Sequence, residues 1–131
     1  MKLTRGHEPG APSEVRDATF TGAVSSDPVI AGIDGVTVNT VMFPPGARTH
    51  WHRHDRGQLL FVTHGRGYVG TRAGEVDTIG PGDVVWFAPD EEHWHGAGPD
   101  TWMSHVAISL GGHAWLDELA DDDFAAAIAG V

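Results

Sequence analysis

Short apolar segments alternate with turn-forming residues along most of this chain, and this alternation restricts the fold more than any other feature. Glycine, proline and aspartate punctuate the chain roughly every ten residues, a spacing typical of all-β sandwiches and barrels. The apolar segments are GVTVNTVMF (35–43), QLLFVTHG (58–65), GYVGT (67–71), EVDTIG (75–80), DVVWF (83–87), HWHGAG (93–98) and MSHVAISL (103–110). We therefore predict an all-β fold built from many short strands.

The two ends of the chain lack this alternation. The first 18 residues are interrupted by glycine and proline and are predicted to be irregular. Near the C-terminus, the apolar residues of the last segment follow a helical period. These residues are Trp115, Leu116, Leu119, Phe124 and Ile128. We predict a helical tail over 113–131.

Composition excludes several classes of function. The chain has 131 residues, which fits one domain, and no cysteine, which excludes disulfides and thiolate sites. Its formal net charge of −10 argues against binding to nucleic acid or to anionic membranes. No apolar run approaches the length of about 18 residues that a membrane-spanning helix needs. We expect a soluble, cytoplasmic protein with no membrane or nucleic-acid partner.

The stretch HWHRHDRGQ (50–58) holds three of the nine histidines of the chain. In an extended strand, His50, His52 and His54 would share one face, because side chains alternate at period two. His93 and His95 share a face in the same way. Imidazole is the commonest neutral ligand for divalent transition metals, so these faces indicate a metal site. Period alone does not choose between His50 and His54, nor between His93 and His95.

Other strands also present a mixed polar and apolar face. The same period aligns Asn39 with Val41, Gln58 with Leu60, and His105 with Ser109. Faces of this kind suit the interior of a barrel that holds a small ligand site.

Two spaced motifs in this region are similar to those of the cupin family. The pattern G-x5-H-x-H-x3-E-x6-G fits from Gly46 through His52, His54 and Gln58 to Gly65, with Gln58 in the place of the usual Glu. The pattern G-x5-P-x-G-x2-H-x3-N fits from Gly82 to His93 in spacing. Ala88, Asp90 and Ala97 depart from its Pro, Gly and Asn.

This resemblance implies a jelly-roll, or double-stranded β-helix, barrel with a metal ion inside. Its implied ligands are His52, His54, Gln58 and His93. We expect an irregular N-terminal arm (1–18), a cupin barrel (19–112) and the helical tail (113–131).

The segments WHRHDRGQLLFV, GPGDVVWFAPDEEHWHG and TWMSHVAI resemble, more narrowly, the small bacterial cupins that include manganese-dependent hydroxynitrile lyases. This resemblance implies reversible cleavage of cyanohydrins, with the metal as Lewis acid and His105 as general base and acid. It also implies that Asn39, Val41 and Ser109 line the substrate pocket; we add Leu60 and His95 by period.

Gln58 in place of a glutamate has a consequence for the metal. Three imidazoles and an amide leave a divalent ion with its full double charge, which strengthens it as a Lewis acid. Manganese is the metal that the resemblance implies, and Fe, Ni, Co and Zn suit the same nitrogen and oxygen ligands.

The leading hypothesis is therefore a metal-dependent lyase acting on a small organic molecule. A cupin dioxygenase or isomerase is the alternative enzyme, and a non-catalytic cupin that binds a small molecule is the alternative outside catalysis. Small cupins usually pair through their sheets, so we also expect a homodimer or homotetramer.

Overall fold

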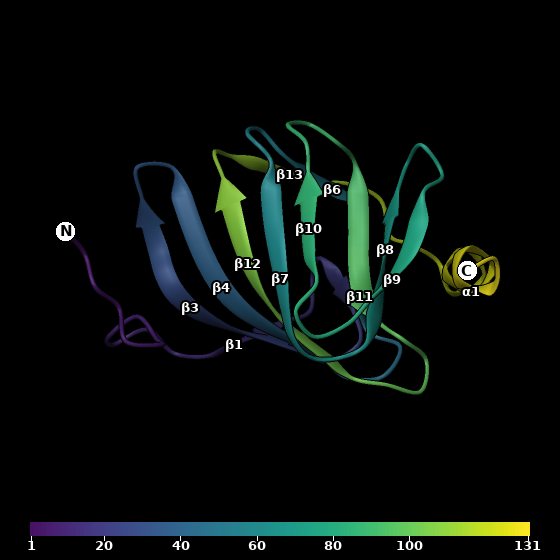
Figure 1. Ribbon diagram of the computed structural model, residues 1–131, viewed down its shortest axis with the longest axis horizontal. Helices are drawn as coiled ribbons and strands as arrows, with labels where there is room; N and C mark the ends of the chain where they lie inside the picture. The colour runs from purple at the N-terminus through teal and green to yellow at the C-terminus, as the bar shows by residue number, and fades with distance from the viewer.

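Two curled sheets face each other and enclose the interior of a barrel (Figure 1). The computed structural model describes residues 1–131, which form 13 strands and one helix. The expected all-β barrel with a short C-terminal helix is confirmed.

The first sheet has six strands. In spatial order these are β1 (Glu14–Arg16), β3 (Val24–Ile33), β4 (Val36–Phe43), β12 (Met103–Leu110), β7 (Gln58–Gly65) and β10 (Val84–Phe87). All neighbouring strands in it are antiparallel.

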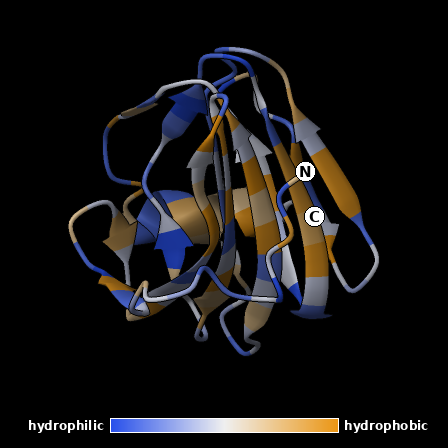
Figure 2. Cartoon of the chain, turned by 90° about the vertical axis from the view of Figure 1, so that its left-hand side faces the viewer, coloured by the Kyte–Doolittle hydropathy of each residue, from blue (hydrophilic) through white to orange (hydrophobic).

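The second sheet has seven shorter strands. Its main path runs through β13 (His113–Trp115), β6 (His52–His54), β11 (His93–Ala97), β5 (Arg48–Thr49) and β2 (Phe20–Thr21). On the other side of β11, β8 (Gly67–Thr71) pairs with it, and β9 (Val76–Ile79) pairs with β8. Most loops are hydrophilic, whereas the strands hold most of the hydrophobic stretches (Figure 2).

The alternation along β12 decides what points into the barrel. His105 lies opposite Val41 on one side and Val62 on the other, and all three are buried. Farther along the strand, Ser109 lies opposite Gln58. Buried apolar side chains from both sheets form the main core, so this interior is apolar toward one end and polar toward the other.

The C-terminal segment differs from the predicted continuous helix. His113 to Trp115 form β13, which pairs with β6, and the helix α1 extends only over Asp121–Ala129. Pairing with a strand that has a free edge satisfies backbone groups that a helix at 113–115 would leave unpaired on β6. Helix α1 begins with three aspartates, whose charge suits the positive end of a helix dipole.

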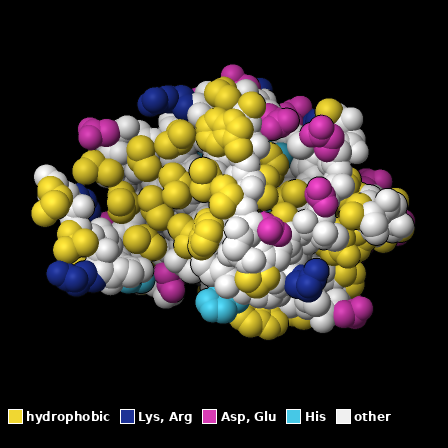
Figure 3. Space-filling view, viewed as in Figure 1, with side chains coloured by type: hydrophobic (Ala, Val, Ile, Leu, Met, Phe, Trp, Pro, Cys, Tyr) yellow, Lys and Arg dark blue, Asp and Glu magenta, His cyan; other side chains and the backbone are white.

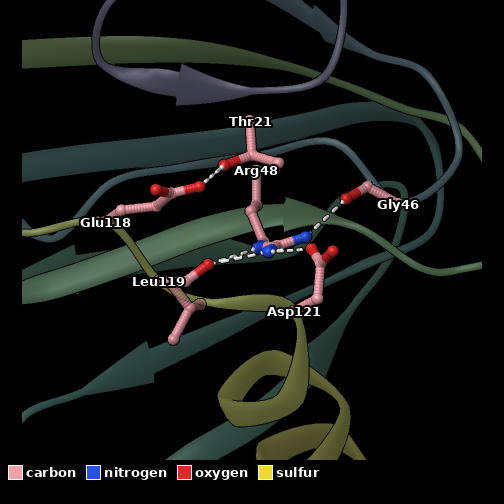
Figure 4. A network of polar contacts seen from close by, with 6 residues as sticks. All are labelled: Thr21, Gly46, Arg48, Glu118, Leu119 and Asp121. Atoms are coloured by element: carbon pink, nitrogen blue, oxygen red, sulfur yellow. Dashed lines mark hydrogen bonds and ion pairs between the residues drawn. The ribbon is translucent and has the colours of Figure 1, made fainter.

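A buried arginine holds the C-terminal segment against the barrel (Figure 4). The Arg48 guanidinium donates to the Leu119 carbonyl at 2.7 and 3.1 Å, and to the Asp121 carboxylate at 2.6 Å. It also lies 4.6 Å from the centre of the Phe124 ring. Leu119 and Phe124 pack with Trp94, so α1 covers the outer side of β11.

The N-terminal arm is not irregular throughout. Residues 14–16 form the edge strand β1, paired to β3 in the register Glu14↔Ser26 and Arg16↔Val24. This short strand places Arg16 beside the open end of the barrel, which the expectation of an irregular arm did not anticipate.

The outer face of the six-stranded sheet, which points away from the barrel interior, also carries apolar side chains. Met42, Phe61, Val84 and Trp86 each expose between 42 and 56% of their surface on this side. Figure 3 shows hydrophobic side chains gathered over these strands. No helix in the structure has the length and apolar character needed to span a membrane.

Candidate metal centre and cavity

Strand pairing brings the two histidine motifs together. His52 on β6 lies opposite His93 on β11. Gln58 follows the end of β6 by a few residues and is the first residue of β7. Gly57 makes this placement of Gln58 possible, because its φ is +97° and a Cβ there would lie 2.4 Å from the Trp86 ring. The side chains of two distant segments thus meet inside the barrel.

Three imidazoles form the tightest group. One ring nitrogen each of His52, His93 and His95 lies within 4.8 Å of the others, and all three residues are buried. His54 lies next to this group, with its ring centre 5.3 Å from that of His52 and 5.9 Å from that of His93. Geometry therefore adds His95 to the candidate ligands, and His54 borders the trio.

Backbone carbonyls orient two of these rings. His52 Nδ1 donates to the His50 carbonyl at 3.0 Å, and His93 Nδ1 donates to the Glu91 carbonyl at 2.7 Å. These bonds assign the proton to Nδ1 and leave the Nε2 lone pair of each neutral ring for another partner. His50 contributes its carbonyl here, not its ring.

The contact between His93 and Gln58 is of a kind that a bound cation would stabilise. Gln58 Nε2 donates to Ser109 Oγ at 3.0 Å, which turns Gln58 Oε1 toward His93 Nε2 at 2.9 Å. Both of these atoms are then acceptors, and two lone pairs facing each other repel. A divalent ion bound to both atoms would remove this repulsion, since imidazole nitrogen and amide oxygen are ordinary ligands of such ions.

Further buried nitrogens lack a partner in the protein. Both ring nitrogens of His54 and the Nε2 of His95 make no hydrogen bond. Buried polar atoms are almost always paired, so these atoms point to a group bound in the site. The residues present therefore fit a metal ion.

Burial keeps the imidazoles neutral. It lowers the pKa of His54, of His93 and of His105 to about 4, because the protein interior disfavours the charged ring. The same cause lowers the pKa of His52 and of His95 well below the usual range. Neutral rings keep the lone pairs that metal binding and proton transfer need.

His95 stands between His105 and the cavity. His105 Nε2 lies 3.0 Å from His95 Nδ1, and the Phe43 ring packs against His105 at 5.2 Å. His95 lines the cavity, whereas His105 does not. The residue expected as general base therefore contacts the cavity through another histidine.

A cavity of about 230 Å³ opens beside the histidines. Its wall includes His52, His54 and Gln58, and four of the five expected pocket residues: Asn39, Val41, His95 and Ser109. Leu60 instead is fully buried in the apolar core, next to Ala107 on β12. Its side chain is buried as expected, but it is not part of the cavity wall, whereas Ala107 beside it and Asn39 on the far side of Ala107 are.

The wall residues that were not anticipated include Arg16, Phe20, His113 and Trp115. The Trp115 ring lies 4.6 Å from that of His52, and the His113 ring 6.1 Å from that of His54. The pattern His113-Ala114-Trp115 is too short to predict a strand, and the helical interpretation of this segment left both His113 and Trp115 out of the site.

Comparison with known proteins identifies the family. The Cupin domain family model matches residues 39–106. The chain belongs to the cupin family. A cupin-like protein from Thermotoga maritima has 34% sequence identity and a TM-score of 0.84, over 92% of this chain and 96% of that chain. The structure of the polyketide cyclase RemF from Streptomyces resistomycificus shares the fold at 18% identity and a TM-score of 0.72, over 94% of this cupin and 91% of that chain.

A functionally described relative is closer in sequence. An (R)-mandelonitrile lyase from Granulicella tundricola is 48% identical over 111 residues, which cover 80% of this cupin and 85% of the relative. This cupin thus combines a group of three histidines that could hold a metal with a lyase as relative.

Proposed function

We propose that this cupin is a metal-dependent hydroxynitrile lyase that cleaves and forms cyanohydrins of small aldehydes. The similarity to an (R)-mandelonitrile lyase carries the proposal. The cavity beside the histidines supports it, because about 230 Å³ suits a small organic molecule.

The ligands in this proposal are His52, His54, Gln58 and His93, as the cupin motif implies. His54 is chosen over His95 because both of its ring nitrogens are free, whereas His95 Nδ1 already faces His105. A bound divalent ion, manganese in our proposal, would supply Lewis acidity toward the cyanohydrin oxygen.

The pair His95–His105 would carry the proton. When His95 Nδ1 donates to His105 Nε2, the lone pair of His95 Nε2 can accept the hydroxyl proton of the cyanohydrin. The bond between the two carbons then breaks, and its electrons leave on cyanide as the carbonyl forms. Cyanide takes the proton back from His95, so the products are an aldehyde and hydrogen cyanide. His105 acts by holding and polarising His95.

Cyanide release from mandelonitrile tests this proposal. We expect the manganese-loaded protein to release cyanide well above the spontaneous rate, to lose this activity after treatment with a chelator, and to regain it when manganese returns. Heat-denatured protein is the control for background decomposition. Metal-loaded protein that releases cyanide no faster than this control would contradict the proposal.

We also propose that two copies associate through the outer face of the six-stranded sheet. This face exposes several large apolar side chains, among them Phe61 and Trp86, and apolar surface gathered on one face is typical of protein–protein contacts. Sedimentation of the wild type should show a dimer or a tetramer, and Trp86→Ser should shift it toward a smaller species. A monomeric wild type at micromolar concentration would contradict this proposal.

A further inference from the structure

The wall of the cavity has an unusual charge for this chain. The protein has 18 acidic residues, yet none of the 16 residues that line the cavity is an aspartate or a glutamate. Arg16 is the one permanently charged side chain among them. An anion entering this cavity therefore meets one cation and no carboxylate in the wall itself, although the protein as a whole is strongly negative and Glu14 pairs with Arg16 from outside the wall.

Arg16 has hydrogen-bonding capacity left for a ligand. Its Nη1 contacts the Glu14 carboxylate at 2.9 Å, and the two side chains expose 35 and 56% of their surface. An exposed pair of this kind holds its partners weakly. Since a guanidinium has five donors, most of them stay available, in the fork that matches a carboxylate.

An aromatic wall connects Arg16 to the histidines. The Arg16 guanidinium lies 5.4 Å from the centre of the Phe20 ring, and Phe20 lies 5.4 Å from Trp115. Trp115 in turn lies 4.6 Å from His52. The cation and the histidine group thus mark two ends of one apolar surface, all of it lining the same cavity.

We propose that this cavity binds small organic acids whose carboxylate and oxygen function stand at opposite ends of an apolar body. The carboxylate pairs with Arg16, the body packs on Phe20 and Trp115, and the hydroxyl or carbonyl oxygen reaches the histidine group. This assignment goes beyond the proposed cyanohydrin chemistry; it shares the cavity and the metal-loaded histidine group with it but does not require turnover.

Two probes of nearly the same shape, one anionic and one neutral, test the assignment. We would titrate the manganese-loaded protein calorimetrically with 4-(hydroxymethyl)benzoate and with its neutral analogue 4-(hydroxymethyl)benzamide. The benzoate should bind about tenfold more tightly or better, which is the size expected for a charge-assisted pair of hydrogen bonds. Equal affinities, or no binding of the benzoate, would overturn the proposal.

Variants locate the effect. Arg16→Gln should weaken binding of the benzoate about tenfold and leave binding of the benzamide unchanged. Arg16→Lys keeps the charge but loses the fork, so its loss should be intermediate. Arg66→Gln is the matched control, since Arg66 is exposed and does not line this cavity. Equal losses in Arg16→Gln and Arg66→Gln would assign the effect to net charge and overturn the role of Arg16.

The outcome is separable from that of the lyase proposal. Protein that binds the benzoate through Arg16 but releases no cyanide would retain this inference and reject the lyase. Protein that releases cyanide but binds the benzoate no better than the benzamide would retain the lyase proposal and reject this inference.

Discussion

Replacement of His54 by alanine is expected to abolish metal binding and cyanide release together. His54 is buried and neither of its ring nitrogens has a partner in the protein, so its side chain has no evident role apart from a ligand. Removal of a residue that only hydrogen-bonds to a metal ligand typically weakens metal affinity 10- to 100-fold. Removal of a ligand itself should therefore weaken metal affinity about a hundredfold or more. Metal content after dialysis and cyanide release from mandelonitrile are the two measurements.

His95→Gln provides the contrast. This variant should keep its metal and still lose activity by about 10²- to 10⁴-fold, the range for removal of a general base. The exposed His64, whose ring stacks on Trp102, supplies the control His64→Ala, in which both quantities should match the wild type. A His95→Gln protein without metal, beside a His54→Ala protein that retains it, would instead assign the site to the tight trio of His52, His93 and His95.

The metal-free protein is expected to lose stability steeply as the pH falls from 7 toward 4. Burial lowers the pKa of His105 to about 4 in the folded protein, whereas an unfolded histidine has its ordinary pKa near 6.5. Between these two values the unfolded chain binds a proton that the folded protein does not, so the free energy of unfolding decreases as the pH decreases. This one residue should account for roughly 2 kcal/mol between pH 7 and pH 5.

Other buried histidines add to the effect. The pKa of His54 and of His93 is also lowered to about 4, so the total loss should amount to several kcal/mol. This loss can be measured by unfolding the protein in urea, with a chelator present, at pH 7, 6 and 5, while tryptophan fluorescence is monitored. In His105→Leu the free energy of unfolding should fall less steeply with pH than in the wild type, because one fewer proton is taken up on unfolding. An unfolding free energy that stays constant from pH 7 to pH 5 would contradict the buried, neutral state of these rings.

The interior of the barrel was largely predictable from the alternation of side chains. Period two places His105 and Ser109 on one side of β12, and the structure has both of them buried inside. The period gives the side of a sheet but not which of the inward-pointing side chains reach the cavity. Leu60 is the example, since it points inward as predicted but lies in the apolar core rather than in the cavity wall.

The mouth of the cavity was not predictable in the same way. Arg16, His113 and Trp115 come from the two ends of the chain, where very short strands gain their structure only by pairing with β3 and β6. Three residues carry too weak a local pattern to indicate a strand, so tertiary pairing decides. The contact between His95 and His105 likewise joins two strands, β11 and β12, that are not neighbours in either sheet.

The manganese content of the protein shows whether neutral side chains of this cupin hold one divalent ion. Protein purified without added metal would be analysed for its elements, then stripped, and titrated with manganese while the spin-resonance signal of the free ion is followed. We expect close to one equivalent of bound metal per chain and a single class of sites. A stripped protein that stays folded at pH 7 and binds no manganese, iron, cobalt, nickel or zinc would contradict it.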